Sequence, residues 1–311
     1  MPFTAIPFLE NAGLKWDQEE LNPDPQVDAQ IKFFAKEGYL VLPKAIPETD
    51  VDSLVATLKA QHEGKTYEQW RRVQDAWREI TLVKQIACDR KILTLLEILY
   101  QRKPIPFQTL NFSLGSEQKI HSDCIHFSAK PERYMCGVWV ALEDIDENNG
   151  PLIYYPESHT LPIVTMEDLG IDGSKTPLNY EAYRLYENYI EDMLVGLKLK
   201  PLSLDIKKGD ALIWSANLLH GGAPIRDKTK TRFSQVTHYY FDNCLYYTPL
   251  FSNTFQGKLF YRQIVDIETG TPVANKYLNQ NSGNFITNSN LPRRGLHLLR
   301  NWLKLERDSG Y

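Results

Sequence analysis

Two histidines and an aspartate in this chain have the types and spacing to hold a metal ion. His121 and Asp123 are separated only by Ser122. On an extended strand, side chains two positions apart point the same way, so this imidazole and this carboxylate would face one site. His220, far downstream, supplies a second imidazole. Two imidazoles and one carboxylate on one side of an ion leave the other positions open, which is the ligand set of non-haem Fe(II) oxygenases.

An arginine downstream of these residues has the shape to bind an organic anion. Arg232 stands at the start of an expected strand, and Ser234 shares its face of that strand. A planar guanidinium donates two parallel hydrogen bonds to a carboxylate, which suits the far end of a dicarboxylate such as 2-oxoglutarate. Arg226 is the competing candidate, but the polar turn 224–228 around it favours a solvated role.

The neighbouring sequence supports a ligand pocket at these residues. The spacing His-x-Asp alone is weak, because a chain with 39 acidic residues and seven histidines contains about one match to it by chance. Residues 118–127 mix polar and apolar side chains, as expected of a strand that lines a pocket. His220 leaves an apolar run and enters the pair Gly221 and Gly222, where the backbone can approach a ligand closely.

Helical spacing dominates the first third of the chain. One helix is expected from Val27 onward and should end at Gly38. Apolar residues within 51–58 repeat at the spacing of a second helix, with Thr49 as its N-cap. Helical character continues through residues 67–100.

From Phe107 the spacing changes to that of strands. Segments 107–114, 134–140, 152–155, 202–206, 211–214 and 234–241 each predict a strand, and residues 180–198 predict a helix inserted among them. Helices followed by many short strands favour an α+β fold. The strand set fits a double-stranded β-helix, or jelly roll, closed around a pocket.

One domain over residues 1–311 accounts for this order of elements. It would comprise a mainly helical part at 27–100, a jelly-roll core at 105–245 and a C-terminal extension at 250–311. Residues 296–305, in the extension, are expected to form a helix that completes the core.

Taken in chain order, these motifs resemble the phytanoyl-CoA dioxygenase family of Fe(II)/2-oxoglutarate oxygenases. The resemblance covers most of residues 27–241, and it depends on the order of the motifs rather than on any one of them. The matching positions are Glu37–Pro43, Gln118, His121, Asp123, Trp139–Asp144, Asn148–Leu152, Pro156–His159, Gly209–Asp210, His220 and Arg232–Ser234.

The resemblance implies roles for seven residues. The iron ligands would be His121, Asp123 and His220. The 2-oxoglutarate site would comprise Arg232, Ser234, Gln118 and Trp139. The implied reaction consumes 2-oxoglutarate and O2, hydroxylates a small-molecule metabolite, and releases succinate and CO2. Related halogenases lack the carboxylate ligand, so its presence favours hydroxylation.

Besides Glu157, which replaces a common glycine in a turn, two positions near the site depart from the family pattern. The family's arginine often stands one residue earlier, where this chain has Thr231, so the loop before Arg232 would carry an extra residue. Gly222 stands where some members have a serine, which removes one auxiliary hydrogen bond.

Composition narrows the class of protein. A net charge of −4 argues against a nucleic-acid-binding surface, and no run of about 18 apolar residues predicts a membrane span. The first residues lack a basic region typical of a signal peptide. Four cysteines without CxxC spacing favour reduced thiols, and hence a cytoplasmic protein. The sequence indicates neither the primary substrate nor the oligomeric state.

Two alternative functions stay open. A cupin-type metal enzyme would need no 2-oxoglutarate, and such an enzyme has no reason to place a fixed cation at Arg232. A non-catalytic jelly-roll binding module is the other alternative, and the complete set of His121, Asp123 and His220 argues against it.

Overall fold

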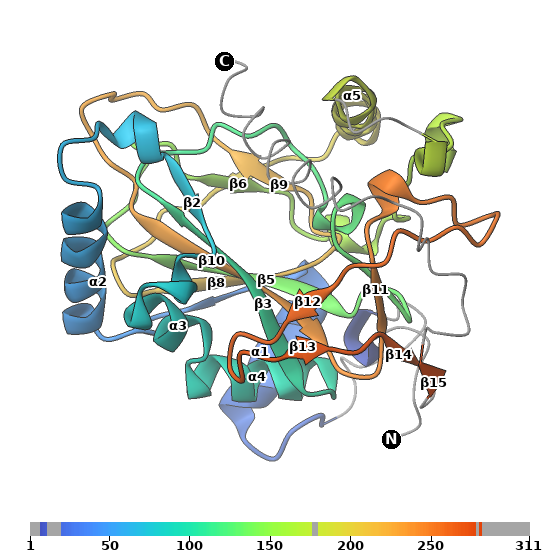
Figure 1. The fold of residues 1–311 in the computed structure, drawn as a ribbon, viewed down its shortest axis with the longest axis horizontal. Coiled ribbons are helices and arrows are strands. Elements are labelled where there is room, and N and C mark those ends of the chain that lie inside the picture. Colours follow the sequence, from blue (N-terminus) through green and yellow to red (C-terminus); the bar gives the residue numbers. More distant parts are fainter. Residues whose placement is uncertain (1–6, 11–19, 176–179, 278–279, 282–311) are drawn as a thin grey trace.

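A six-stranded sheet lies between a layer of helices and a smaller sheet in the computed structural model (Figure 1). The structure describes residues 7–10, 20–175, 180–277 and 280–281. Two β-layers, with four of the helices on the outer face of the large sheet, form the α+β jelly roll that the sequence predicts. The space between the two sheets holds the candidate site.

The large sheet is antiparallel throughout, in the order β1-β8-β5-β10-β3-β2. Its strands are β1 (Tyr39–Leu42), β2 (Arg72–Gln74), β3 (Pro104–Phe112), β5 (Met135–Ala141), β8 (Ala211–Ser215) and β10 (Ser234–Phe241). The small sheet has the order β7-β6-β9, with β6 (Leu152–Tyr154), β7 (Leu202–Ser203) and β9 (His220–Gly222). The expected strands at 107–114, 134–140, 152–155, 211–214 and 234–241 are therefore present, whereas only the first two residues of 202–206 form a strand.

Shorter elements complete the described part of the chain. Three strand pairs lie outside the two sheets: β4 (Ser128–Lys130) with β11 (Leu245–Tyr247), β12 (Ile264–Val265) with β13 (Pro272–Val273), and β14 (Lys276–Tyr277) with β15 (Gln280–Asn281). Short 3-10 helices include η5 (Asp123–Ile125) and η9 (Pro249–Phe251), with others at Phe8–Glu10, Tyr67–Trp70, Ala76–Arg78, Ser158–Thr160, Glu167–Leu169 and Gly173–Lys175.

The helices are α1 (Pro25–Glu37), α2 (Glu48–Gln61), α3 (Thr81–Ala87), α4 (Arg90–Tyr100) and α5 (Tyr180–Leu197). The carboxylate of Asp24 caps α1 by accepting hydrogen bonds from two backbone N–H groups, and Gly38 ends this helix in the left-handed region, with φ of 80°. The inserted helix α5 and the end of α1 at Gly38 confirm the sequence predictions.

The alternation of each central strand separates two cores. In β10, Tyr239 and Phe241 point toward α1–α4 and join the large helix-facing core. Val236, on the opposite face, packs in the core between the sheets with Trp139 and Trp214. A third cluster joins the buried face of α5 to the segments around η5 and η9.

Two details of the helical part differ from expectation. Thr49 is not the N-cap of α2, because the helix begins one residue earlier and Pro47 occupies the cap. Segment 67–100 is not helical throughout, since β2 interrupts it and pairs with β3 at the sheet edge. Asp75 ends β2 in a left-handed conformation, and its backbone N–H donates to the carbonyl of Thr109. Pairing with the sheet has overridden the local helical pattern here.

Other expectations have a mixed outcome. All four cysteines are free thiols. None of the helices in the described ranges is long and apolar enough to cross a bilayer. The expected helix at 296–305 lies outside the described residues, and the treatment of 1–311 as one domain stays a prediction.

Replacing Gly38 with alanine should lower the free energy of unfolding by about 2 kcal/mol more than replacing Gly64, measured by urea denaturation. Both glycines are left-handed, with φ of 80° and 79°, so both substitutions carry the same backbone strain. A Cβ at Gly38 would lie 2.4 Å from Nδ1 of His159, whereas Gly64 has no neighbour within 4 Å. Equal losses at the two positions would contradict this account.

Candidate metal centre

A two-residue antiparallel bridge brings the two histidines together. His121 pairs with His220, the first residue of β9, and each backbone N–H donates to the other's carbonyl at 3.0 Å. Directly opposed residues of an antiparallel pair place their side chains on the same face. The two imidazoles therefore project together into the space between the sheets, with ring centroids 4.6 Å apart.

Backbone carbonyls fix the orientation of both rings. Nδ1 of His121 lies 2.9 Å from the carbonyl oxygen of Lys119, and Nδ1 of His220 lies 2.9 Å from that of Leu218. A carbonyl only accepts hydrogen bonds, so both Nδ1 atoms carry the proton. Each Nε2 is consequently left with a lone pair for a metal ion. The side-chain amide nitrogen of Gln118 lies 3.4 Å from Nε2 of His121.

Asp123 completes the cluster by a turn rather than by a continuous strand. The backbone is extended at Ser122, whose hydroxyl accepts from the N–H of Cys124, and η5 begins at Asp123. The expected strand over 118–127 is therefore wrong: His121 forms only an isolated bridge, and the chain turns into η5 at Asp123. Oδ1 of Asp123 lies 3.9 Å from Nε2 of His121 and 4.0 Å from Nε2 of His220.

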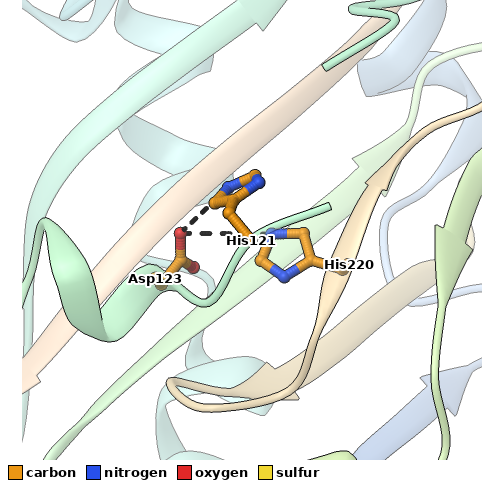
Figure 2. A group of neighbouring side chains, drawn as sticks. All are labelled: His121, Asp123 and His220. Atoms are coloured by element: carbon orange, nitrogen blue, oxygen red, sulfur yellow. Dashed lines mark ion pairs between the residues drawn. The ribbon is translucent and has the colours of Figure 1, made fainter. Parts of the chain in front are cut away.

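Figure 2 shows the carboxylate facing both imidazoles. One ligand atom from each of the three residues lies within 4.8 Å of the other two, and all three residues are buried. Two imidazole nitrogens and one carboxylate oxygen, close together in one pocket, form a donor set suited to iron. The residues present therefore fit the metal that the sequence motif predicts.

Trp214 and Gly137 position the carboxylate. The indole N–H of Trp214, on β8, donates to Oδ2 of Asp123 at 2.8 Å, so Oδ1 is the oxygen that faces the histidines. Gly137 lies directly opposite on β5, and a Cβ there would come within 2.3 Å of the indole ring. The sequence predicts only a strand at Trp214. A glycine within an otherwise apolar strand was the available signal of this close contact.

Surrounding charges keep Asp123 ionised. Burial tends to raise its pKa, but the three nearby histidines and the indole N–H outweigh burial and hold the pKa below its ordinary value. One of these histidines is His238, whose Nε2 lies 3.8 Å from Oδ2 of Asp123. Burial lowers the pKa of His238 to about 4, so this side chain is neutral at physiological pH. His238 is thus a buried neighbour of the proposed metal ligands.

The cluster opens into a pocket of about 980 Å³, a volume that includes the open mouth. Gln118, Trp139 and Arg232 line this pocket together with the three clustered residues. His126 lines it as well, although a continuous strand would have turned its side chain away. The turn at η5 explains the difference.

Arg232 is a buried cation without an anionic partner in the described ranges. Its guanidinium lies over the rings of Phe112 and Trp139, at 5.4 and 5.6 Å from their centroids. Burial lowers its pKa to about 10, the charge of Arg71 adds to this effect, and Glu143 opposes it. The side chain therefore stays charged at neutral pH, in a place where an unpaired charge is costly.

Three buried polar atoms beside this cation have no hydrogen-bond partner among the residues that the structure describes: Nε of Arg232, Oγ of Ser234 and Nε1 of Trp139. Buried donors are normally satisfied, so this group indicates a place for a polar ligand. Arg226, the competing candidate, instead forms an exposed ion pair with Glu147.

A match to a known protein family covers most of the residues that line this pocket. The family model for phytanoyl-CoA dioxygenase (PhyH) matches residues 34–232, well over half of the chain. The chain belongs to the phytanoyl-CoA dioxygenase family. The match includes all three clustered residues and ends at Arg232.

Curated relatives of this family are distant. The peroxisomal phytanoyl-CoA dioxygenase of Rattus norvegicus is 26% identical over 137 residues, which cover 42% of this chain and 36% of the rat protein. The corresponding protein of Mus musculus is 28% identical over 120 residues, 37% of this chain and 30% of its own. The chain thus matches about a third of the length of these relatives.

Solved structures share the fold. The epimerase SnoN from nogalamycin biosynthesis, in complex with Fe3+, alpha-ketoglutarate and nogalamycin RO, aligns with a TM-score of 0.55 at 18% identity, covering 80% of this chain and 96% of its own. EctD from S. alaskensis with bound Fe aligns with a TM-score of 0.53 at 16% identity, covering 72% and 78%. At identities this low, the comparison shows that this phytanoyl-CoA dioxygenase family member has the same fold as these two proteins.

Replacing Trp214 with phenylalanine should weaken Fe(II) binding about tenfold, because Asp123 loses the donor that orients it. Anaerobic titration with Fe(II) measures the affinity. Trp77→Phe is the matched control, since its indole N–H also donates to an aspartate, Asp75, but away from the pocket. The same iron affinity in the Trp214 variant, the control and the unmodified protein would exclude a positioning role for Trp214.

Proposed function

We propose that this protein is an Fe(II)- and 2-oxoglutarate-dependent dioxygenase that hydroxylates a small molecule and releases succinate and CO2. The observation that carries the proposal is the presence, in one pocket, of three residues suited to bind iron and a buried arginine that has no carboxylate partner in the described part of the chain. A metal with two nitrogen ligands and one carboxylate keeps positions for a co-substrate and O2.

His121, Asp123 and His220 would hold the iron. Their burial and the hydrogen bonds behind them fix the three donor atoms before the metal arrives. When bound, iron and 2-oxoglutarate supply the oxidising chemistry, in which decarboxylation of the co-substrate drives oxidation of the substrate. The protein contributes position, charge and the exclusion of water.

Arg232 would bind the carboxylate of 2-oxoglutarate that is distant from the metal. Among the described residues this cation has no carboxylate within 4 Å, and Oγ of Ser234 and Nε1 of Trp139, which have no partner there, would donate hydrogen bonds to the same group. Gln118, next to Nε2 of His121, would contact the co-substrate near the metal. The low-dielectric surroundings strengthen the ion pair and favour a fixed orientation of the ligand.

Hydroxylation is the proposed outcome because Asp123 retains the carboxylate ligand. The two alternative functions account for the ligand cluster or the fold but not for Arg232. A cupin-type metal enzyme without 2-oxoglutarate, or a binding module without catalysis, gives no reason for a buried unpaired arginine in line with the three ligands. A cytoplasmic location stays a prediction from the reduced cysteines.

Replacing Arg232 with methionine should weaken 2-oxoglutarate binding by roughly 2–5 kcal/mol, because the carboxylate would be buried without its cation. The charge-transfer absorption band of the Fe(II)/2-oxoglutarate complex, formed without oxygen, measures binding. Arg226→Met is the matched control, since it removes an exposed arginine on the same loop. If the Arg226 variant lost binding while the Arg232 variant did not, the assigned anchor would be wrong.

Succinate should form from 2-oxoglutarate, Fe(II) and O2 when the correct substrate is present in a metabolite screen. His121→Ala should abolish both succinate formation and the absorption band, because a ligand atom is removed. His62→Ala, at a partly exposed histidine outside the pocket, should leave both unchanged. Absence of the band in the unmodified protein at saturating iron and 2-oxoglutarate would contradict the proposed function.

A further inference from the structure

Another arginine lines the same pocket from outside the matched family region. Arg262 lies in the segment after β11, 30 residues beyond the end of the family match at 232. Its backbone is fixed by hydrogen bonds with Tyr246 and Asn275, and its Nη1 donates to Oγ1 of Thr248 at 3.0 Å. Both Arg262 and Thr248 line the pocket. The side chain is therefore held in place rather than extended into solvent.

The two arginines lie over phenylalanine rings at different points along the pocket wall. Arg262 lies over Phe127 and Phe107, with its guanidinium carbon 4.6 and 5.9 Å from the ring centroids. Arg232 lies over Phe112. Phe107 and Phe112 are five positions apart on β3, a separation of about 16 Å along the strand.

His238 joins the metal cluster to the Arg262 side of the pocket. Its ring lies beside Phe127, with centroids 4.9 Å apart, and its Nε2 is 3.8 Å from Oδ2 of Asp123. A co-substrate that joins the metal to Arg232 would extend away from Arg262. The region between the metal and Arg262 is thus left for the primary substrate.

The charge of Arg262 is not balanced by a nearby carboxylate in the described part of the chain. No carboxylate oxygen there lies within 4 Å of its guanidinium, and its Nε is buried without a hydrogen-bond partner. Burial lowers its pKa, which Tyr240 and Asp75 only partly oppose. Arg72 also lines the pocket.

With iron and 2-oxoglutarate bound, the charges in the pocket would leave Arg262 without a compensating anion. The two charges of Fe(II) and the charge of Arg232 would be neutralised by Asp123 and the two carboxylates of 2-oxoglutarate. Arg262 would keep its charge in a partly desolvated wall, at a cost that an anionic ligand removes.

We propose that Arg262, with the hydroxyl of Thr248, binds an oxyanion group of the primary substrate, which makes that substrate a carboxylate or phosphate-bearing small molecule. This inference rests on the proposed function. The aromatic side chains of Phe127 and Phe251 line the same wall and would contact the apolar body of the molecule. Arg262 would thereby set substrate choice without taking part in binding 2-oxoglutarate.

Benzoate, its uncharged analogue benzamide and inorganic phosphate are suitable probes. Calorimetric titration into the protein loaded with Mn(II) and 2-oxoglutarate should show benzoate or phosphate binding at least about tenfold more tightly than benzamide. Arg262→Met should remove this preference, while the methionine stem preserves packing against the phenylalanine rings. If benzoate binds with the higher affinity, the substrate group is a carboxylate, and if phosphate does, it is a phosphate.

Two controls separate the possible failures. Lys258→Met removes an exposed cation from the same segment and should leave all affinities unchanged. 2-Oxoglutarate affinity, measured first in every protein, should be the same in the Arg262 variant. Equal binding of anions and benzamide to the unmodified protein, or unchanged anion binding in the Arg262 variant, would overturn the inference alone. Failure of the unmodified protein to bind 2-oxoglutarate would overturn both this inference and the proposed function.

Discussion

Two backbone hydrogen bonds between His121 and His220 determine the geometry of the whole pocket. They join segments that lie far apart in the chain and turn both imidazoles into the space between the sheets. Because side chains alternate along an extended segment, a shift of one residue in this pairing would send a histidine to the opposite face. The carbonyls behind the rings then leave both Nε2 atoms free to bind a metal.

The pocket keeps charges in places where a stable core would avoid them. Asp123 is buried among three histidines, and Arg232 and Arg262 lie on aromatic rings without a carboxylate within 4 Å in the described ranges. Such charges oppose folding unless a ligand compensates them. Their presence in one pocket with the ligand cluster is explained better by bound anions than by stability.

Residue spacing was enough to predict the parts of the site that depend on local pattern. The predicted strand at 234–241 coincides with β10, and His121, Asp123 and His220 converge as their types and order suggest. The family resemblance is confirmed by the match over residues 34–232.

The remaining features depend on contacts between distant segments. The hydrogen bond from Trp214 to Asp123 requires the missing side chain at Gly137 on the next strand, and no local pattern reveals that pairing. β2 forms within a helical pattern because β3 offers it an edge. Arg262 reaches the pocket from a segment whose polar composition gave no sign of a ligand-binding role.

The contact between Gly137 and Trp214 also constrains how this site can diverge during evolution. Any side chain at Gly137 would occupy the space of the indole ring, so this glycine can change only together with Trp214. A descendant that acquired an alanine there would need a smaller residue on β8 and a new hydrogen-bond donor for its aspartate. Co-substitution at these two positions would therefore mark lineages whose metal environment has been rebuilt.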